Sequence, residues 1–156
     1  MYSVKPYILK NFLFIFCVSL LFLNCEDSFD GDDGNNCLQD KNVNVTLNLN
    51  LPSFGDLQFT GGSDFIRDEV SFIKGVYIQN LGGGEFLVLE LAEPNDCLQV
   101  CDVATSLTDG EFVYECGDET RSYSLLGNKR DKVEGEFDMR RYGARLSQNS
   151  QLTISF

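Results

Sequence analysis

Residues 43–51 read VNVTLNLNL and alternate between aliphatic and polar side chains without an exception. A period of two places every aliphatic side chain on one face of an extended chain and every polar one on the other. Such a segment is typical of a half-buried strand in an antiparallel sheet. Pro52 follows and is expected to end the strand, because proline has no N–H for the ladder.

Further short segments of β-branched, aliphatic and aromatic residues are separated by turn residues. Residues 75–80 and 86–91 flank Gly82-Gly83-Gly84 and predict a hairpin. Residues 53–68 are polar and glycine-rich but keep five apolar side chains, which predicts a long ordered loop with short strands. More strands are expected at 111–116 after a turn at 108–110, at 123–126, at 142–146 and, after a turn at 148–150, at 152–156.

No segment sustains the 3.6-residue period of an amphipathic helix. The sequence therefore predicts one small all-β domain, residues 42–156, built as an antiparallel sandwich or barrel.

The composition excludes several classes of function. The 156 residues include 24 acidic and 12 basic side chains and no histidine, for a net charge of -12. Without imidazole there is no Ser-His-Asp or Cys-His nucleophile pair, no histidine-ligated zinc and no histidine proton shuttle. The acidic excess also argues against nucleic acid as a partner. We therefore expect a protein that is not an enzyme.

The first 24 residues have the layout of a secretion signal. Lys5 and Lys10 precede the apolar run FLFIFCVSLLFL at 12–23, and no acidic residue occurs among them. As a helix this run spans about 18 Å, less than the ~30 Å hydrocarbon layer of a membrane. Leu21-Phe22-Leu23-Asn24-Cys25 resembles a bacterial lipobox, although Asn24 replaces the usual small residue. The resemblance implies a lipoprotein signal at 1–24 and acylation of Cys25; an ordinary secreted protein is the alternative.

An acidic, glycine-rich segment follows Cys25 and predicts a flexible tether at 25–41. An acidic run after the lipidated cysteine resembles the signal that exports lipoproteins of Bacteroidota to the outer face of the outer membrane. Residues 30–35 are spaced loosely like a calcium loop but lack its distal Glu and flanking helices. A charged tether is the preferred interpretation, and an acidic binder of divalent cations is kept as an alternative.

Four cysteines remain in the exported domain, because Cys17 leaves with the signal and Cys25 is expected to carry lipid. They are Cys37, Cys97, Cys101 and Cys116. Four cysteines in an exported chain indicate two disulfides, and three pairings are open.

The C-terminal half resembles the Rieske [2Fe-2S] domain, a small all-β fold whose cluster is held by two loops, Cys-x-His and Cys-x-x-His. The matching stretches are Cys97-Leu98-Gln99 and Cys116-Gly117-Asp118-Glu119. Supporting features are Cys101, Tyr123, the segment 139–142 with its following hairpin, and the entry strand at 43–51, which looks like that of Rieske-like lipoproteins of Bacteroidota.

The two histidine ligands of the family are missing, since Gln99 and Glu119 stand in their places. The resemblance then implies a domain that has lost its cluster and carries no cofactor. It also implies a Cys97–Cys116 disulfide in place of the metal site, with Cys37–Cys101 as the second bond; Cys101 as a buried thiol and Cys37 as an exposed one is the alternative. A [2Fe-2S] centre on four cysteine thiolates remains the rival interpretation.

Two charged clusters have competing interpretations. Glu111, Glu115, Asp118 and Glu119 could form a paired-carboxylate site, but a solvated edge is preferred. The basic residues at 129–132 and 140–141 could face a partner, a lipid headgroup or, most simply, the acidic tether.

We therefore expect a cell-envelope protein anchored by lipid at the outer membrane, on the cell-surface side. Its role would be non-catalytic, either structural or binding an envelope protein. The alternative is a [2Fe-2S] electron-transfer protein.

Overall fold

A computed structural model describes residues 37–156. The predicted signal peptide (1–24), the lipidation site Cys25, the loop at 30–35 and most of the tether (25–41) lie outside the described residues.

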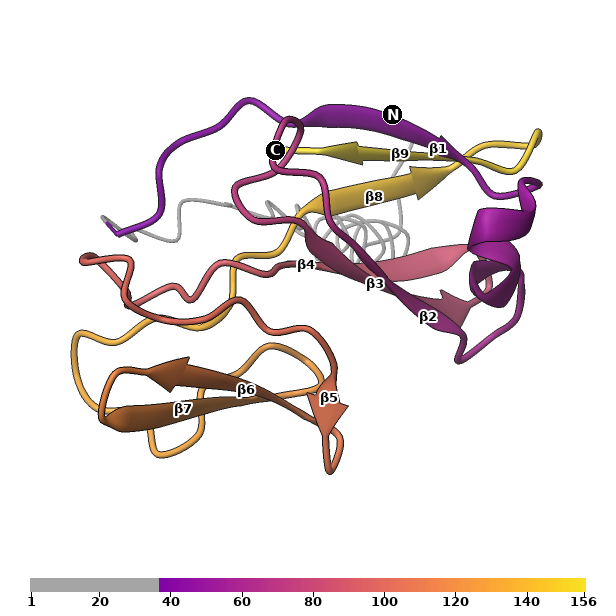
Figure 1. Ribbon diagram of the computed structural model, residues 1–156. Coiled ribbons are helices and arrows are strands. Elements are labelled where there is room, and N and C mark those ends of the chain that lie inside the picture. The colour runs from indigo at the N-terminus through magenta and orange to yellow at the C-terminus, as the bar shows by residue number, and fades with distance from the viewer. Residues whose placement is uncertain (1–36) are drawn as a thin grey trace, which may run out of the picture. The chain divides into compact units, whose positions relative to one another are not determined.

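The described part of the chain contains nine β-strands, all paired antiparallel, and one short 3-10 helix (Figure 1). In chain order they are β1 (Asn44–Asn48), η2 (Pro52–Gln58), β2 (Ser63–Ile66), β3 (Val76–Gly82), β4 (Glu85–Glu90), β5 (Leu107–Thr108), β6 (Glu111–Cys116), β7 (Glu119–Ser124), β8 (Gly143–Leu146) and β9 (Gln151–Ser155). The expected all-β class with antiparallel pairing is confirmed. Among residues 37–156, no helix has the length and apolar character needed to cross a membrane.

The strands form three sheets, which we name A (β1-β9-β8), B (β2-β3-β4) and C (β5-β6-β7). Sheet A brings the first and last strands of the domain together, with Val45 opposite Ile154 and Leu47 opposite Leu152. Both of these strands are therefore held by cross-strand hydrogen bonds within sheet A.

Strand β1 is shorter than the alternation at 43–51 predicts. The chain turns at Asn48, whose carbonyl accepts from the Leu51 N–H at 3.1 Å and whose side chain accepts from the Asn50 N–H at 3.0 Å. Leu49 is still buried, but Leu51 is 48% exposed, so the prediction of one buried face is wrong at its last residue. The turn leads directly into η2, which the prediction of a loop at 53–68 did not include. Pro52 fits at its first turn, where no N–H is needed, and Leu57 anchors the helix in the core.

Sheet B contains the predicted hairpin. Residues Gly83 and Gly84 form its two-residue loop with φ of 64° and 87°, a conformation that requires positive φ at both positions. A bulge between Asn80 and Gly82 precedes the loop. This prediction is confirmed.

Sheet C agrees with the sequence at one hairpin and differs at the next. The β5–β6 turn is Asp109-Gly110, with φ of 52° and 81°, as predicted. Strand β7 begins at Glu119 and not at 123, because Gly117 and Asp118 form a tight two-residue turn in which Gly117 has a φ of 65°. It ends at Ser124, whose carbonyl accepts from the Gly127 N–H at 2.8 Å. The predicted strand at 123–126 is therefore wrong at both ends.

Sheet B separates two apolar cores. Val76, Ile78 and Val88 face a core shared with sheet A, whereas Tyr77, Leu87 and Leu89 face a core shared with sheet C. Burial on both faces explains why Val76–Ile78 in β3 and Phe86–Leu89 in β4 are continuous apolar runs and do not alternate as β1 does. The segment 139–142 runs beside β4 and contributes Met139 to one core and Tyr142 to the other. The Glu90 N–H donates to the Arg140 carbonyl at 2.9 Å, and the Met139 N–H donates to the Gly127 carbonyl at 2.8 Å.

Candidate functional site

The four cysteines of the domain form two disulfides, Cys37–Cys97 and Cys101–Cys116. Two disulfides are as expected, but the pairing of Cys97 with Cys116 and of Cys37 with Cys101 is wrong. The reason is strand geometry. Cys101 and Cys116 form an antiparallel bridge with their Cα atoms 4.0 Å apart, and the Asp102 N–H donates to the Glu115 carbonyl at 2.9 Å.

Cys97 lies four residues earlier, on the exposed part of the β4–β5 loop, and pairs with Cys37 in the segment before β1. The alternative of free thiols at Cys37 and Cys101 is also wrong. The two bonds hold the loop at both ends of the stretch 97–101, which we call the cysteine loop.

Two carboxylates shape the approach to the cysteine loop. Glu93 is buried and accepts hydrogen bonds from the Tyr123 hydroxyl, from the Asn95 N–H at 2.7 Å and from Arg121 Nη1 at 3.1 Å. Asp96 accepts from the backbone N–H groups of Val100 and Cys101 at 2.9 and 2.7 Å. Both carboxylates therefore act as fixed acceptors inside the domain.

A third carboxylate, Glu90, organises the segment before β3. It is fully buried and accepts from the N–H groups of Ile73 (3.0 Å), Lys74 (2.8 Å) and Ala92 (3.1 Å) and from the Tyr142 hydroxyl (2.7 Å). Four donors satisfy a charge that would otherwise be costly to bury. Burial, followed by the Glu90 charge, raises the pKa of Tyr142 and keeps its phenol protonated as a donor.

The four positions that match the Rieske ligands do not form a ligand set. Cys97 and Cys116 are bonded to different partners. Gln99 lies on the exposed cysteine loop with a φ of 54°, and the Glu119 side chain is 73% exposed and lies 3.5 Å from Arg121 Nη2. A [2Fe-2S] cluster needs thiolates or imidazoles, and all four thiols of the domain are consumed in disulfides. These residues do not fit the cluster. Nor does the described part of the chain arrange three or more Cys, Asp or Glu side chains to hold a metal ion.

The acidic residues around the β6–β7 turn do not share a common contact. Glu111 pairs with Arg130 at 2.8 Å, Glu115 accepts from the Thr120 hydroxyl at 3.2 Å, and Asp118 is exposed. Glu111 and Glu115 lie on one face of β6, the central strand of sheet C, and Asp118 lies in the β6–β7 turn, so these acids are spread over a solvated surface of the sheet.

The basic residues at 129–132 and 140–141 contact the domain's own acceptors. Lys129 pairs with Glu136 at 3.1 Å and Lys132 with Asp138 at 2.9 Å. Arg140 is buried, donates to the Gln39 carbonyl at 3.0 Å and lies over the Phe156 ring. Arg140 thus fixes the end of the tether that the structure describes.

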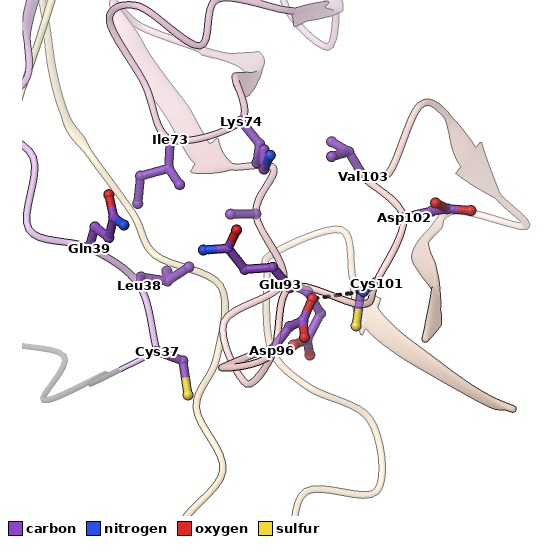
Figure 2. A pocket seen from close by; sticks show the side chains of 12 residues that line it. Cys37, Leu38, Gln39, Ile73, Lys74, Glu93, Asp96, Cys101, Asp102 and Val103 are labelled. Atoms are coloured by element: carbon purple, nitrogen blue, oxygen red, sulfur yellow. Dashed lines mark hydrogen bonds between the residues drawn. The ribbon is translucent and has the colours of Figure 1, made fainter. Parts of the chain in front are cut away.

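A pocket of about 310 Å³ opens where three segments meet: the tether end at 37–39, the residues before β3, and the cysteine loop with its flanks (Figure 2). Its apolar lining comes from Leu38, Ile73, Ala92 and Val103, and Lys74 is its one basic lining residue. Local sequence patterns do not indicate this pocket, because disulfide pairing and the contacts of Glu90 bring its three walls together.

Comparison with known proteins identifies no relative: no family model, curated protein or solved structure matches this chain.

The buried hydroxyls allow a direct test of Glu90. We predict that Tyr142→Phe lowers the free energy of unfolding by about 1–3 kcal/mol, because it leaves a buried carboxylate short of one donor. Tyr114→Phe is the matched control, since the Tyr114 hydroxyl is buried without a hydrogen-bond partner and its loss should be neutral or stabilising. Urea unfolding with the disulfides intact measures the free energy of unfolding of both variants. An equal loss of stability in the two variants would contradict the role given to Glu90.

Proposed function

We propose that this chain is a lipid-anchored cell-envelope protein that has a Rieske-like β domain without a cluster and serves as a non-catalytic binding module. The observation that carries the proposal is the Cys101–Cys116 disulfide. It joins the β4–β5 loop to the β6–β7 hairpin, which are the two loops that would hold the cluster between them.

The resemblance to the Rieske fold is supported by the placement of these loops. The Rieske family is a small antiparallel β domain of the sandwich or barrel kind with two ligand loops in contact. Here Cys97 and Cys101 lie between β4 and β5, and Cys116 ends β6. The covalent bond supplies the contact that a metal would otherwise make.

The rival proposal, a [2Fe-2S] electron-transfer protein, has less support. It requires both disulfides to be reduced in a compartment that favours disulfides, and it requires Cys37 in the predicted tether to become a ligand. Gln99 and Glu119 supply no imidazole.

The cysteine loop has the features of a binding surface. Leu98 and Val100 are 82% and 57% exposed, and both lie between cross-linked cysteines. Apolar side chains on a preorganised backbone lose little entropy on binding. The neighbouring Asp102, Asp118 and Glu119 are exposed acids, so the partner they fit is an envelope protein with an apolar recess bordered by basic residues.

Anchoring follows from the N-terminal sequence. Two disulfides agree with an oxidising location outside the cytoplasm. Acylation of Cys25 would hold the domain at the outer membrane, on the cell-surface side, by an acidic tether.

Lipidation is tested by Cys25→Ser. We predict that this substitution abolishes incorporation of labelled palmitate and releases the protein from the membrane fraction, because the acylated side chain is lost. Cys17→Ser is the control and should still be labelled, since that residue leaves with the signal. Labelling that survives Cys25→Ser would contradict the anchor.

Loss of the cluster is tested by metal and thiol analysis of the same purified protein. We predict a negligible iron content, no visible charge-transfer band and no reactive thiol after denaturation without reductant. Anaerobic purification provides the control for cluster loss in air. About two irons per chain in either preparation would establish the electron carrier instead.

A further inference from the structure

Lys74 is unusual among the cations of this domain. Of the 12 basic residues in the chain, Lys5 and Lys10 precede the described part. Eight of the ten in residues 37–156 contact a carboxylate or a backbone carbonyl, namely Lys41, Arg67, Arg121, Lys129, Arg130, Lys132, Arg140 and Arg141. Within this range only the side chains of Lys74 and Arg145 have no such partner. Arg145 is exposed, whereas Lys74 is half-buried and lines the pocket.

The carboxylates around the pocket do not neutralise the Lys74 ammonium. Glu90 binds the Lys74 backbone N–H and three other donors. Glu93 and Asp96 are occupied by Arg121, Tyr123 and backbone N–H groups. Asp102 is exposed, and its side chain points away from Lys74, beyond Val103 (Figure 2). A half-buried lysine side chain without an ion-pair partner favours a ligand that brings an anion.

The walls of the pocket are fixed before any ligand arrives. The Cys37–Cys97 bond and Arg140 hold the tether end, Glu90 holds Ile73 and Lys74, and the Cys101–Cys116 bond holds the far wall. Gly75 adds a constraint, because its φ of 114° suits glycine and leaves no room for a Cβ beside the Ile66 carbonyl. Preorganised walls reduce the entropy lost on binding.

The size and lining of the pocket define the class of ligand. A volume of about 310 Å³ equals roughly ten water molecules, which suits a small organic molecule. The aliphatic wall of Leu38, Ile73, Ala92 and Val103 fits an apolar body, and the amides of Gln39 and Gln99 can hydrogen-bond a polar group. Since the chain carries a net charge of -12, a single negative charge is repelled less than the double charge of a phosphate ester.

We propose that this pocket binds a small aliphatic monocarboxylate, such as an acylated amino acid or a peptide C-terminus, with its carboxylate on Lys74. The inference goes beyond the proposed role of the cysteine loop. It does not require the lipid anchor, but it shares with the proposed cluster-free domain the two disulfides that hold the pocket walls. The iron and palmitate measurements do not use the pocket, so their outcomes and that of the ligand titration can be told apart.

The test is a titration of the full mature chain, extracted in mild detergent, by isothermal calorimetry. The probes are N-acetyl-L-leucine and N-acetyl-L-leucinamide, which differ only in the charge of the terminal group. We expect saturable binding of the acid and at least about tenfold weaker binding of the amide, because the amide cannot form the charge-assisted contact. Saturation by neither probe, or equal affinity for both, would overturn the proposal.

Two variants assign the effect to the pocket. Lys74→Gln should weaken binding of the acid by about tenfold and leave the amide unchanged. Arg145→Gln removes an equal charge elsewhere on the domain and should leave both affinities unchanged. Thermal unfolding of each variant shows whether the fold is retained. Undiminished acid binding by a folded Lys74→Gln variant would overturn the assignment, and an equal loss in Arg145→Gln would show a general charge effect instead.

Discussion

The disulfide between Cys101 and Cys116 is the constraint on which the arrangement of the cysteine loop and the neighbouring pocket depends. It fixes the β4–β5 loop against the β6–β7 hairpin and places Asp102 beside Glu115. With that end of the loop fixed, the second bond from Cys97 to Cys37 holds the cysteine loop over the end of the tether. The exposed Leu98 and Val100, and the pocket behind them, are consequences of these two bonds.

Buried carboxylates are the second set of interactions that hold the loops in place. Glu90 and Glu93 lie at the end of β4 and just beyond it, and together they accept hydrogen bonds from backbone N–H groups, tyrosines and an arginine. A buried charge stabilises a fold only when its hydrogen-bonding capacity is filled. The acidic composition is therefore partly structural: some acids organise loops, while others remain on the solvated surface.

The fold was predictable where local physics decides it. The strict alternation of apolar and polar residues predicted β1, and glycines between apolar segments predicted two hairpin turns. The structure has these turns at Gly83-Gly84 and Asp109-Gly110, where the backbone φ is positive. Local signals were insufficient for η2, because the strand already ends at the Asn48 turn and Pro52 instead begins a helix. They were also insufficient for β7, which begins as early as Glu119 because of a tight turn at Gly117. The candidate site was less predictable. Which cysteine faces Cys116 depends on a cross-strand bridge, and the position of Lys74 depends on the distant Glu90.

The role of the two disulfides is tested by mapping which cysteines are linked. Proteolysis of the native protein without reduction, followed by mass spectrometry of the linked peptides, identifies each bond. We expect Cys37 linked to Cys97 and Cys101 linked to Cys116, with no free thiol among the four. A Cys97–Cys116 link, or free thiols at these positions in protein purified without reductant, would contradict the role given to the two bonds.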